Sequence, residues 1–242
     1  MLVDNVFLEP DVSKSYKGIR TYNVIRSLEP LGWYPYSSSA RRTTKGDPLE
    51  SFHVVRMRND NMKIDDDFIE LVLSNSHKKD ASFTVDIGIY RLVCANGLVI
   101  GNSILEKLII PHKGFITTII PDIIDIYLSK ALQNVENSIF TMKHIKPDQK
   151  KIEEFTFNSF YLKHKKEYSP ENIEQLYMPK RVADNDGSAW SIYNVVQEKL
   201  IAGEYNIIGS DKKTRKARKT NSAKEELELN KNLFNLAQKV LV

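Results

Sequence analysis

The stretch FTVDIGIYRLVCANGLVIG (residues 83–101) decides the fold class of this chain. Apolar residues occupy every second position from Phe83 to Ile89, which is typical of a strand with a buried face. The dipeptide Asn96-Gly97 predicts a tight turn, and the apolar residues that follow it predict a return strand. Because connections this short cannot form parallel crossovers, the stretch predicts an antiparallel sheet.

The sequence before this stretch predicts further strands, and the sequence after it predicts mainly helices. Alternation predicts further strands over residues 52–58 and 68–73, and an aromatic cluster at 33–36 leads into a polar, basic loop. From Pro121 onward apolar residues recur at three- and four-residue spacings. Helices are predicted over residues 18–28, 121–139, 147–166 and 189–202 and from residue 223. The predicted fold class is α+β: mainly antiparallel sheet in the first half, with helices of the second half packed on it and a C-terminal helix.

Composition excludes several classes of protein. The 242 residues carry a net charge of +4, with 41% hydrophobic and 27% charged residues, which fits a globular chain and neither a disordered nor a collagen-like one. The most apolar stretch, residues 115–128, contains a proline and two aspartates and falls short of the ~20 apolar residues of a membrane span. Cys94 is the single cysteine, so no intramolecular disulfide can form. No signal peptide is visible, and a cytoplasmic protein without a membrane partner is expected.

The positive charge is concentrated near the C-terminus. Residues 212–224 hold seven lysines and arginines and no acid, so they contribute +7, and +4 minus 7 leaves −3 for the rest. Such a stretch is either solvated or bound to a polyanion. We expect a single α+β domain over residues 1–205, followed over 206–242 by a basic linker and an amphipathic helix. Self-association is predicted through an apolar stripe on that helix: Leu229, Leu233, Leu236 and Val240.

Enzyme signatures are absent from the sequence. The five histidines show no zinc-binding spacing, and neither a nucleophile elbow nor a phosphate-binding glycine loop is present. We therefore predict no catalytic residue, no metal and no cofactor. An unfamiliar enzyme site built on His53, His77 and the acids 65–67 is the weakest of three hypotheses, because consecutive carboxylates point in different directions.

Nucleic-acid binding has more support, since it needs basic side chains, aromatic rings for stacking and a basic arm. Arg56 and Arg58 point to the same side of their predicted strand, where they either contact a phosphate backbone or pair with the acids at 65–67. The predicted nucleic-acid-binding residues are Arg41, Arg42, Lys45, Arg56, Arg58, His77, Lys78, Lys79, Arg91, Lys212, Lys213, Arg215, Lys216, Arg218 and Lys219.

Several motifs, in order, resemble one family. They are T-x-x-V-x-x-x-L with G-W-x-P (21–35), H-x-x-R (53–56), N-S-H (75–77), Y-R-L-V-C-A-N-G-L (90–98) and A-W-S-I-Y-N-V-V (189–196). Together they are similar to the phage/plasmid-like family catalogued as domain of unknown function 932. The resemblance implies a gene of phages, plasmids or integrated elements, working in a bacterial cytoplasm. It implies no mechanism and no catalytic residue.

Two interpretations of the motif residues stay open. His53, Arg56, Asn75, His77 and Arg91 form either a satisfied buried network or a binding surface. The predicted function is a nucleic-acid-binding accessory protein of a mobile element, acting on single-stranded DNA in replication or strand-annealing recombination. The alternative is a protein-interaction module, such as an inhibitor of a host defence complex.

Overall fold

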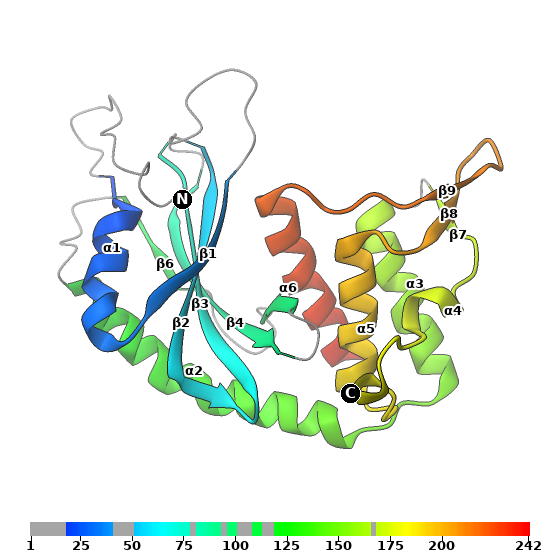
Figure 1. Ribbon diagram of the computed structural model, residues 1–242, viewed down its shortest axis with the longest axis horizontal. Coiled ribbons are helices and arrows are strands. Elements are labelled where there is room, and N and C mark those ends of the chain that lie inside the picture. The colour runs from blue at the N-terminus through cyan, green and yellow to red at the C-terminus, as the bar shows by residue number, and fades with distance from the viewer. Residues whose placement is uncertain are drawn as a thin grey trace. The chain divides into compact units, whose positions relative to one another are not determined.

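The computed structural model describes residues 18–40, 51–77, 81–92, 96–100, 108–112, 119–165 and 168–242. These residues form two compact units, which Figure 1 draws in one chain. Unit 1 lies within Met1–Val99, Glu106–Gln133 and Ser222–Lys224, and unit 2 lies within Ile100–Leu105, Asn134–Asn221 and Glu225–Val242. The two units do not divide the chain at residue 205, where the sequence analysis places a domain boundary. That residues 1–205 fold as one independent domain stays a prediction.

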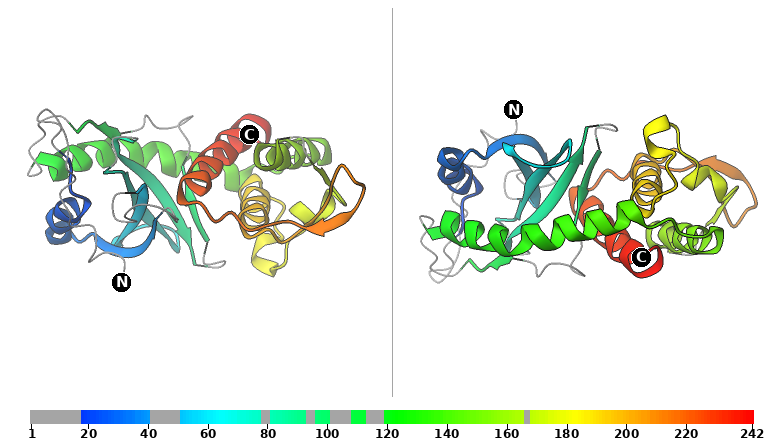
Figure 2. Two further views of the ribbon diagram at one scale, coloured as in Figure 1. Left: turned by 90° about the horizontal axis from the view of Figure 1, so that it is seen from above. Right: turned by 90° about the horizontal axis from the view of Figure 1, so that it is seen from below.

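Unit 1 is built on a strongly curved antiparallel sheet, whose curl is visible in Figures 1 and 2. Its strands are β1 (Tyr34–Ala40), β2 (His53–Ile64), β3 (Asp67–Asn75), β4 (Phe83–Arg91), β5 (Asn96–Val99) and β6 (Leu108–Ile110). The order is β1-β2-β3-β4-β5, and β6 pairs with the other end of β4. The predicted antiparallel sheet in the first half is confirmed.

The two central strands carry most of the apolar core of this sheet. β3 and β4 are buried along nearly their whole length. Leu71, Leu73, Val85 and Ile87 are at most 1% exposed. Burying each such side chain stabilises the fold by about 1.5–3 kcal/mol, so these strands anchor the unit.

Strand β1 replaces the polar loop that the sequence predicts after the aromatic cluster. The residues Tyr-Pro-Tyr-Ser-Ser-Ser show no apolar alternation, so periodicity gives no sign of a strand. Main-chain pairing with β2, from Tyr34 opposite Arg58 to Ala40 opposite His53, makes this segment a strand. A register shift follows Pro35, which cannot donate a ladder hydrogen bond.

The predicted tight turn at Asn96-Gly97 is wrong. Both residues belong to β5, where Asn96 lies opposite Arg91 and Gly97 opposite Tyr90. Gly97 is not among the glycines with positive φ. A Cβ at this position would instead lie 2.9 Å from Nη1 of Arg56. The glycine is therefore needed for space beside an arginine, not for a turn.

The predicted helices are present in both units. In unit 1, α1 (Thr21–Leu28) continues into a short 3-10 helix, η2 (Glu29–Leu31), which ends at Gly32 in the left-handed region. The long helix α2 (Ile120–His144), shown from two sides in Figure 2, contributes its residues up to Gln133 to unit 1 and the rest to unit 2.

Unit 2 combines helices with a small three-stranded sheet. Its remaining helices are α3 (Gln149–His164), α4 (Glu174–Tyr177), the 3-10 helix η5 (Val182–Asp184), α5 (Ala189–Ala202) and α6 (Ala223–Val240). The sheet has the order β7 (Ser169–Pro170), β8 (Asn206–Ile208), β9 (Thr214–Lys216). Asp148 caps α3 and Ser188 caps α5, because each side chain accepts a hydrogen bond from the main-chain N–H three residues later.

Helix α5 forms the centre of unit 2. Every residue from Ala189 to Gln197 is buried, and Tyr193 packs edge-on against Phe234 of α6. The apolar stripe of α6 is largely used inside the chain, since Leu229, Leu233 and Val240 are buried. Self-association through this stripe stays a prediction. No helix among the described residues combines the length and apolarity of a membrane span.

Candidate nucleic-acid interface

The two arginines predicted on the same side of β2 do lie on one side, and both bind an acid. Nη1 of Arg56 donates to one carboxylate oxygen of Glu70 at 2.7 Å, and Nε of Arg58 donates to the other at 2.7 Å. The Glu70 side chain has no exposed surface. The expected pairing with the acids at 65–67 is therefore wrong for these two, because Glu70 lies directly across the ladder from Arg58.

Aromatic rings enclose the second of these arginines. The guanidinium of Arg58 lies 3.2 Å from the ring centroid of Tyr36 and 3.5 Å from that of Tyr90. This arrangement combines an ion pair with cation–π contacts to two rings. Arg58 and the ring of Tyr36 are thus engaged with each other, and the arginine has little surface left for a ligand.

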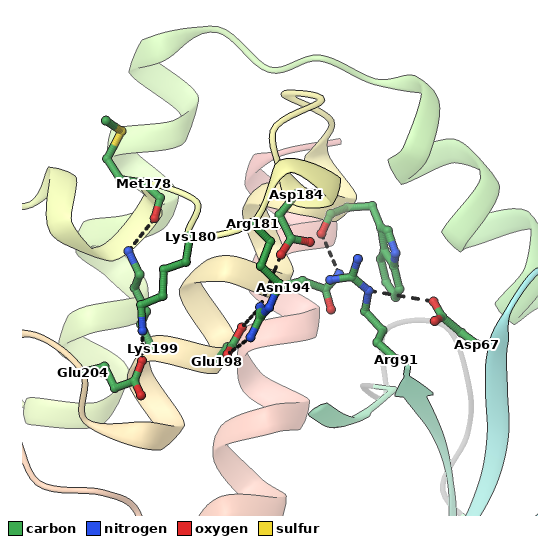
Figure 3. A network of polar contacts seen from close by, with 11 residues as sticks. Asp67, Arg91, Met178, Lys180, Arg181, Asp184, Asn194, Glu198, Lys199 and Glu204 are labelled. Carbon is green, nitrogen blue, oxygen red and sulfur yellow. Dashed lines mark hydrogen bonds and ion pairs between the residues drawn. The ribbon is translucent and has the colours of Figure 1, made fainter. Parts of the chain in front are cut away.

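Arg56 is fixed on a second side by the main chain of β5. Its Nη2 donates to the carbonyl of Gly97 at 3.1 Å. The space that the guanidinium fills is the one that a side chain on Gly97 would need. Arg91, at the end of β4, pairs with Asp67, with Nε 3.8 Å from Oδ2 (Figure 3). All three sheet arginines therefore have carboxylate partners.

The motif residues His53 and Asn75 belong to a buried hydrogen-bond network under the start of α1. Nδ1 of His53 faces the carbonyl of Ser51 at 3.0 Å, and a carbonyl can only accept. That nitrogen therefore carries the proton, and Nε2 accepts from Oγ1 of Thr21 at 2.7 Å. Asn75 donates to the carbonyl of Ile19 at 2.8 Å and to Oγ1 of Thr21 at 3.0 Å. These contacts tie the helix to the ends of β2 and β3.

His77 is the partner ring of His53 rather than a surface residue. The two ring centroids are 5.4 Å apart, and His77 is 4% exposed. Burial, together with the neighbouring His53, His112 and Arg20, lowers the pKa of His77 to about 4. Burial also lowers the pKa of His53 and that of His112, which accepts the N–H of Ile19 at 3.0 Å. Of the two open interpretations, this geometry favours the buried network.

The enzyme hypothesis requires His53 to lie close to the acids at 65–67, and the β2–β3 pairing places Asp67 far from it. His53 and Asn75 face each other at one end of the β2–β3 hairpin, while Asp67 begins β3 at the other end. Asn75 is eight residue steps along β3 from Asp67, which amounts to ~26 Å of strand. Among the residues that the structure describes, no group of three or more His, Cys, Asp or Glu is placed to hold a metal ion.

The basic residues of unit 2 are arranged differently from those of the sheet. We call residues 212–219 the basic segment; it contains β9 and the residues on either side of that strand. The segment is not the linker that the sequence predicts, since β9 pairs with β8 in a hairpin. Six of its side chains are cationic and exposed: Lys212, Lys213, Arg215, Lys216, Arg218 and Lys219.

One of these six cations is neutralised within the chain. Arg215 forms a two-pronged ion pair with Asp211, an acid that lies just before the segment and that the sequence analysis did not count. Over the part of the chain that the structure describes, the other five form no ion pair. The remaining predicted residues, Arg41, Arg42, Lys45, Lys78 and Lys79, lie outside the described residues.

Other cations of unit 2 serve the fold. Figure 3 shows Arg181 paired with Glu198 through two 2.7 Å hydrogen bonds, and Lys180 paired with Glu204. Lys199 is buried and donates to the main-chain carbonyls of Gln175 and Met178, the latter at 2.5 Å. The basic segment differs from these residues, because it is a run of exposed cations of which five form no ion pair among the described residues.

Comparison with known proteins gives a family but no structure. A family model described as "Domain of unknown function (DUF932)" matches residues 11–234. Two proteins of Escherichia coli (strain K12), UPF0380 protein YafZ and UPF0380 protein YfjQ, are each 25% identical to the chain over 235 residues. The match covers 95% of this chain and 84% of each of those proteins. No solved structure matches.

Proposed function

The chain belongs to the DUF932 family, and from this premise we propose that it is a non-enzymatic protein that binds single-stranded DNA through its basic segment. The proposed setting is the replication or strand-annealing recombination of a phage, plasmid or integrated element. That setting follows from the resemblance of the motif residues to the phage/plasmid-like family. The interface itself rests on the charges of unit 2.

The observation that carries the proposal is the contrast between paired and unpaired cations. Arg56, Arg58 and Arg91 are held by carboxylates and are nearly buried. Five cations of the basic segment are exposed and form no ion pair among the described residues. Five exposed cations within eight residues are suited to binding phosphates, and this charge density supports the proposal.

Binding at such a surface gains its free energy from released counterions. Each phosphate that a lysine or arginine neutralises releases counterions from the nucleic acid, so the affinity falls as the salt concentration rises. With five free cations, the slope of log affinity against log salt is expected to be about −3.5 for a single strand. Contacts of this kind carry no base sequence preference.

The single-strand preference is supported by exposed aromatic surface. In unit 2, which holds the basic segment, Phe157 on α3 is 40% exposed, and an exposed ring of this kind can stack on an unpaired base. Trp33 and Trp190 are buried, which removes the two larger rings from consideration.

The proposal is tested by titrating fluorescent 30-nucleotide single strands and the matching duplex at several salt concentrations. A variant with Lys212, Lys213, Lys216 and Lys219 changed to Gln loses four of the free charges. Its salt slope is expected to be smaller by about 3 than that of the unchanged protein. Its affinity at low salt should fall by about 100-fold or more.

A matched control removes the same number of charges from other exposed positions of unit 2: Lys146, Lys150, Lys151 and Lys239, each changed to Gln. This variant should keep the affinity and slope of the unchanged protein. Equal losses in both variants would mean that net charge alone drives binding. Absence of binding to any oligonucleotide at low salt, or equally tight binding to polyglutamate, would overturn the proposal and favour the protein-interaction alternative.

A further inference from the structure

The main chain after β9 is fastened along the end of helix α5. The N–H of Ala217 donates to the carbonyl of Tyr205 at 2.9 Å, and the N–H of Thr220 donates to the carbonyl of Ile201 at 2.9 Å. The side chains of Ala217 and Thr220 are buried, at 6% and 8% exposure. The intervening residues Arg218 and Lys219 are exposed. Two buried, hydrogen-bonded residues thus flank two exposed cations.

Gly203 allows this close approach. It ends α5 in the left-handed region, with a φ of +71°. A Cβ at this position would lie 2.6 Å from the carbonyl carbon of Arg218 and 2.7 Å from the main-chain nitrogen of Lys219. Those contacts involve main-chain atoms, which cannot move aside as the end of a flexible side chain can. The segment therefore lies directly against the end of the helix.

Lys163 joins the same two elements from the neighbouring helix α3. Its Nζ donates to the carbonyl of Leu200, in the last turn of α5, at 2.5 Å, and to the carbonyl of Arg218 at 2.7 Å. The Leu200 carbonyl is among those that a helix end leaves without an intrahelical partner. Burial lowers the pKa of Lys163 to about 8, so the amine is still mainly charged at pH 7. Its ammonium group therefore donates to two carbonyls, one from α5 and one from the basic segment.

From these contacts we infer that Lys163 is a positioning residue, which holds the basic segment in place as a preformed platform for the phosphate backbone of a single strand. This inference rests on the proposed function. Its new content is that the segment is ordered before a ligand arrives. Lys163 acts through the main chain of Arg218 and not by touching the nucleic acid.

Preformed order raises affinity because binding then requires less ordering of the chain. Each loop segment or long side chain that must be fixed on binding lowers the affinity, because it loses conformational freedom. A segment that Lys163 already holds avoids part of this cost. Removing the amine should therefore weaken binding without changing how many phosphates are contacted.

The variant Lys163→Met keeps the aliphatic stem and removes both hydrogen bonds. We expect trypsin to cut the free protein within residues 212–219 about tenfold faster than the unchanged protein, because the segment detaches more often. The affinity for a 30-nucleotide single strand should fall about 3- to 10-fold, with the salt slope unchanged. Lys151→Met, an exposed lysine on the same helix, is the control and should change none of these values.

The possible outcomes distinguish the positioning role of Lys163 from the proposed function. Cutting of Lys163→Met at the unchanged rate, or a salt slope that falls with the affinity, would overturn the positioning role. If no oligonucleotide binds the unchanged protein, the proposed function fails, while the trypsin rates still decide whether Lys163 holds the segment. Should Lys163→Met not fold, hydrogen exchange of the unchanged protein gives the answer: the N–H groups of Ala217 and Thr220 should be protected, and immediate exchange would contradict the inference.

Discussion

Nε of Arg58 donates a 2.7 Å hydrogen bond to Oε1 of Glu70, and the carboxylate that accepts it is fully buried. The other oxygen accepts from Arg56. One buried acid on β3 thus holds two guanidinium groups of the neighbouring strand β2. The sheet arginines consequently stabilise unit 1, whereas the exposed cations of the basic segment lie in unit 2.

Replacing the acid should be costly for folding. Glu70→Ala leaves two largely buried arginines without their carboxylate partner, and breaking a buried ion pair from one side costs about 3–5 kcal/mol. We expect a loss near the lower value, about 3 kcal/mol, because Arg56 keeps its hydrogen bond to Gly97. Urea unfolding followed by circular dichroism measures the free energy of unfolding.

An exposed ion pair of the same unit provides the comparison. Arg26 and Glu29 pair at 2.8 Å, with 61% and 26% of their side chains exposed. Glu29→Ala should cost less than about 1 kcal/mol. Similar losses for the two variants would show that the contacts of Glu70 do not stabilise the sheet more than a surface pair does.

The sequence predicts the central strands and the helices well because their apolar periodicity is strong. It also places Arg56 and Arg58 on one face, since strand residues two apart share a side. Their partner could have been found: Glu70 is the one charged residue within the apolar run 68–73, and a lone acid in a buried strand needs cationic neighbours.

The missed features depend on contacts between distant segments. β1 becomes a strand through pairing with β2, for which its own residues carry no periodic signal. The basic segment reads as a linker because its six cations cannot form a core. Its order comes from Lys163 and Gly203, which lie well before it in the sequence. The sequence pattern of the segment itself does not indicate contacts with residues elsewhere in the chain.

Substitutions of Gly203 and Gly187 allow the effect of backbone strain on stability to be separated from that of close packing. Gly203 and Gly187 have φ values of +71° and +70°, but a Cβ at Gly187 would meet nothing within 4 Å. Gly187→Ala should therefore cost only the left-handed strain, about 1–2 kcal/mol. Gly203→Ala should cost at least about 1 kcal/mol more, because its methyl group collides with the basic segment. Urea unfolding of both variants measures the difference.

The same pair should differ in a local measurement. Tryptic cutting within residues 212–219 should speed up in Gly203→Ala and stay unchanged in Gly187→Ala. Equal unfolding free energies and equal cutting rates in the two variants would mean that the segment does not lie against the end of α5.

A buried amide pair joins α5 to α6. Nε2 of Gln197 donates to Oδ1 of Asn230 at 2.5 Å, and the two residues are at most 1% exposed. Asn230→Leu removes the acceptor and should cost about 1–3 kcal/mol, since a buried donor loses its partner. The double variant Gln197→Met with Asn230→Leu should regain about 1 kcal/mol of that loss. Strictly additive losses in this double-mutant cycle, measured by urea unfolding, would show that the pair is not coupled.

The buried histidines of unit 1 should make the fold sensitive to acid. The pKa of His77 falls from 6.5 to about 4 in the folded chain. Between these values the unfolded chain binds a proton that folded His77 does not, so the stability is complete above pH 6.5 and is lost as the pH falls toward 4. His77→Gln should show a shallower decline of unfolding free energy over this interval. His144→Gln, at an exposed position, should follow the unchanged protein, and a His77→Gln curve parallel to both would refute the buried neutral state of His77.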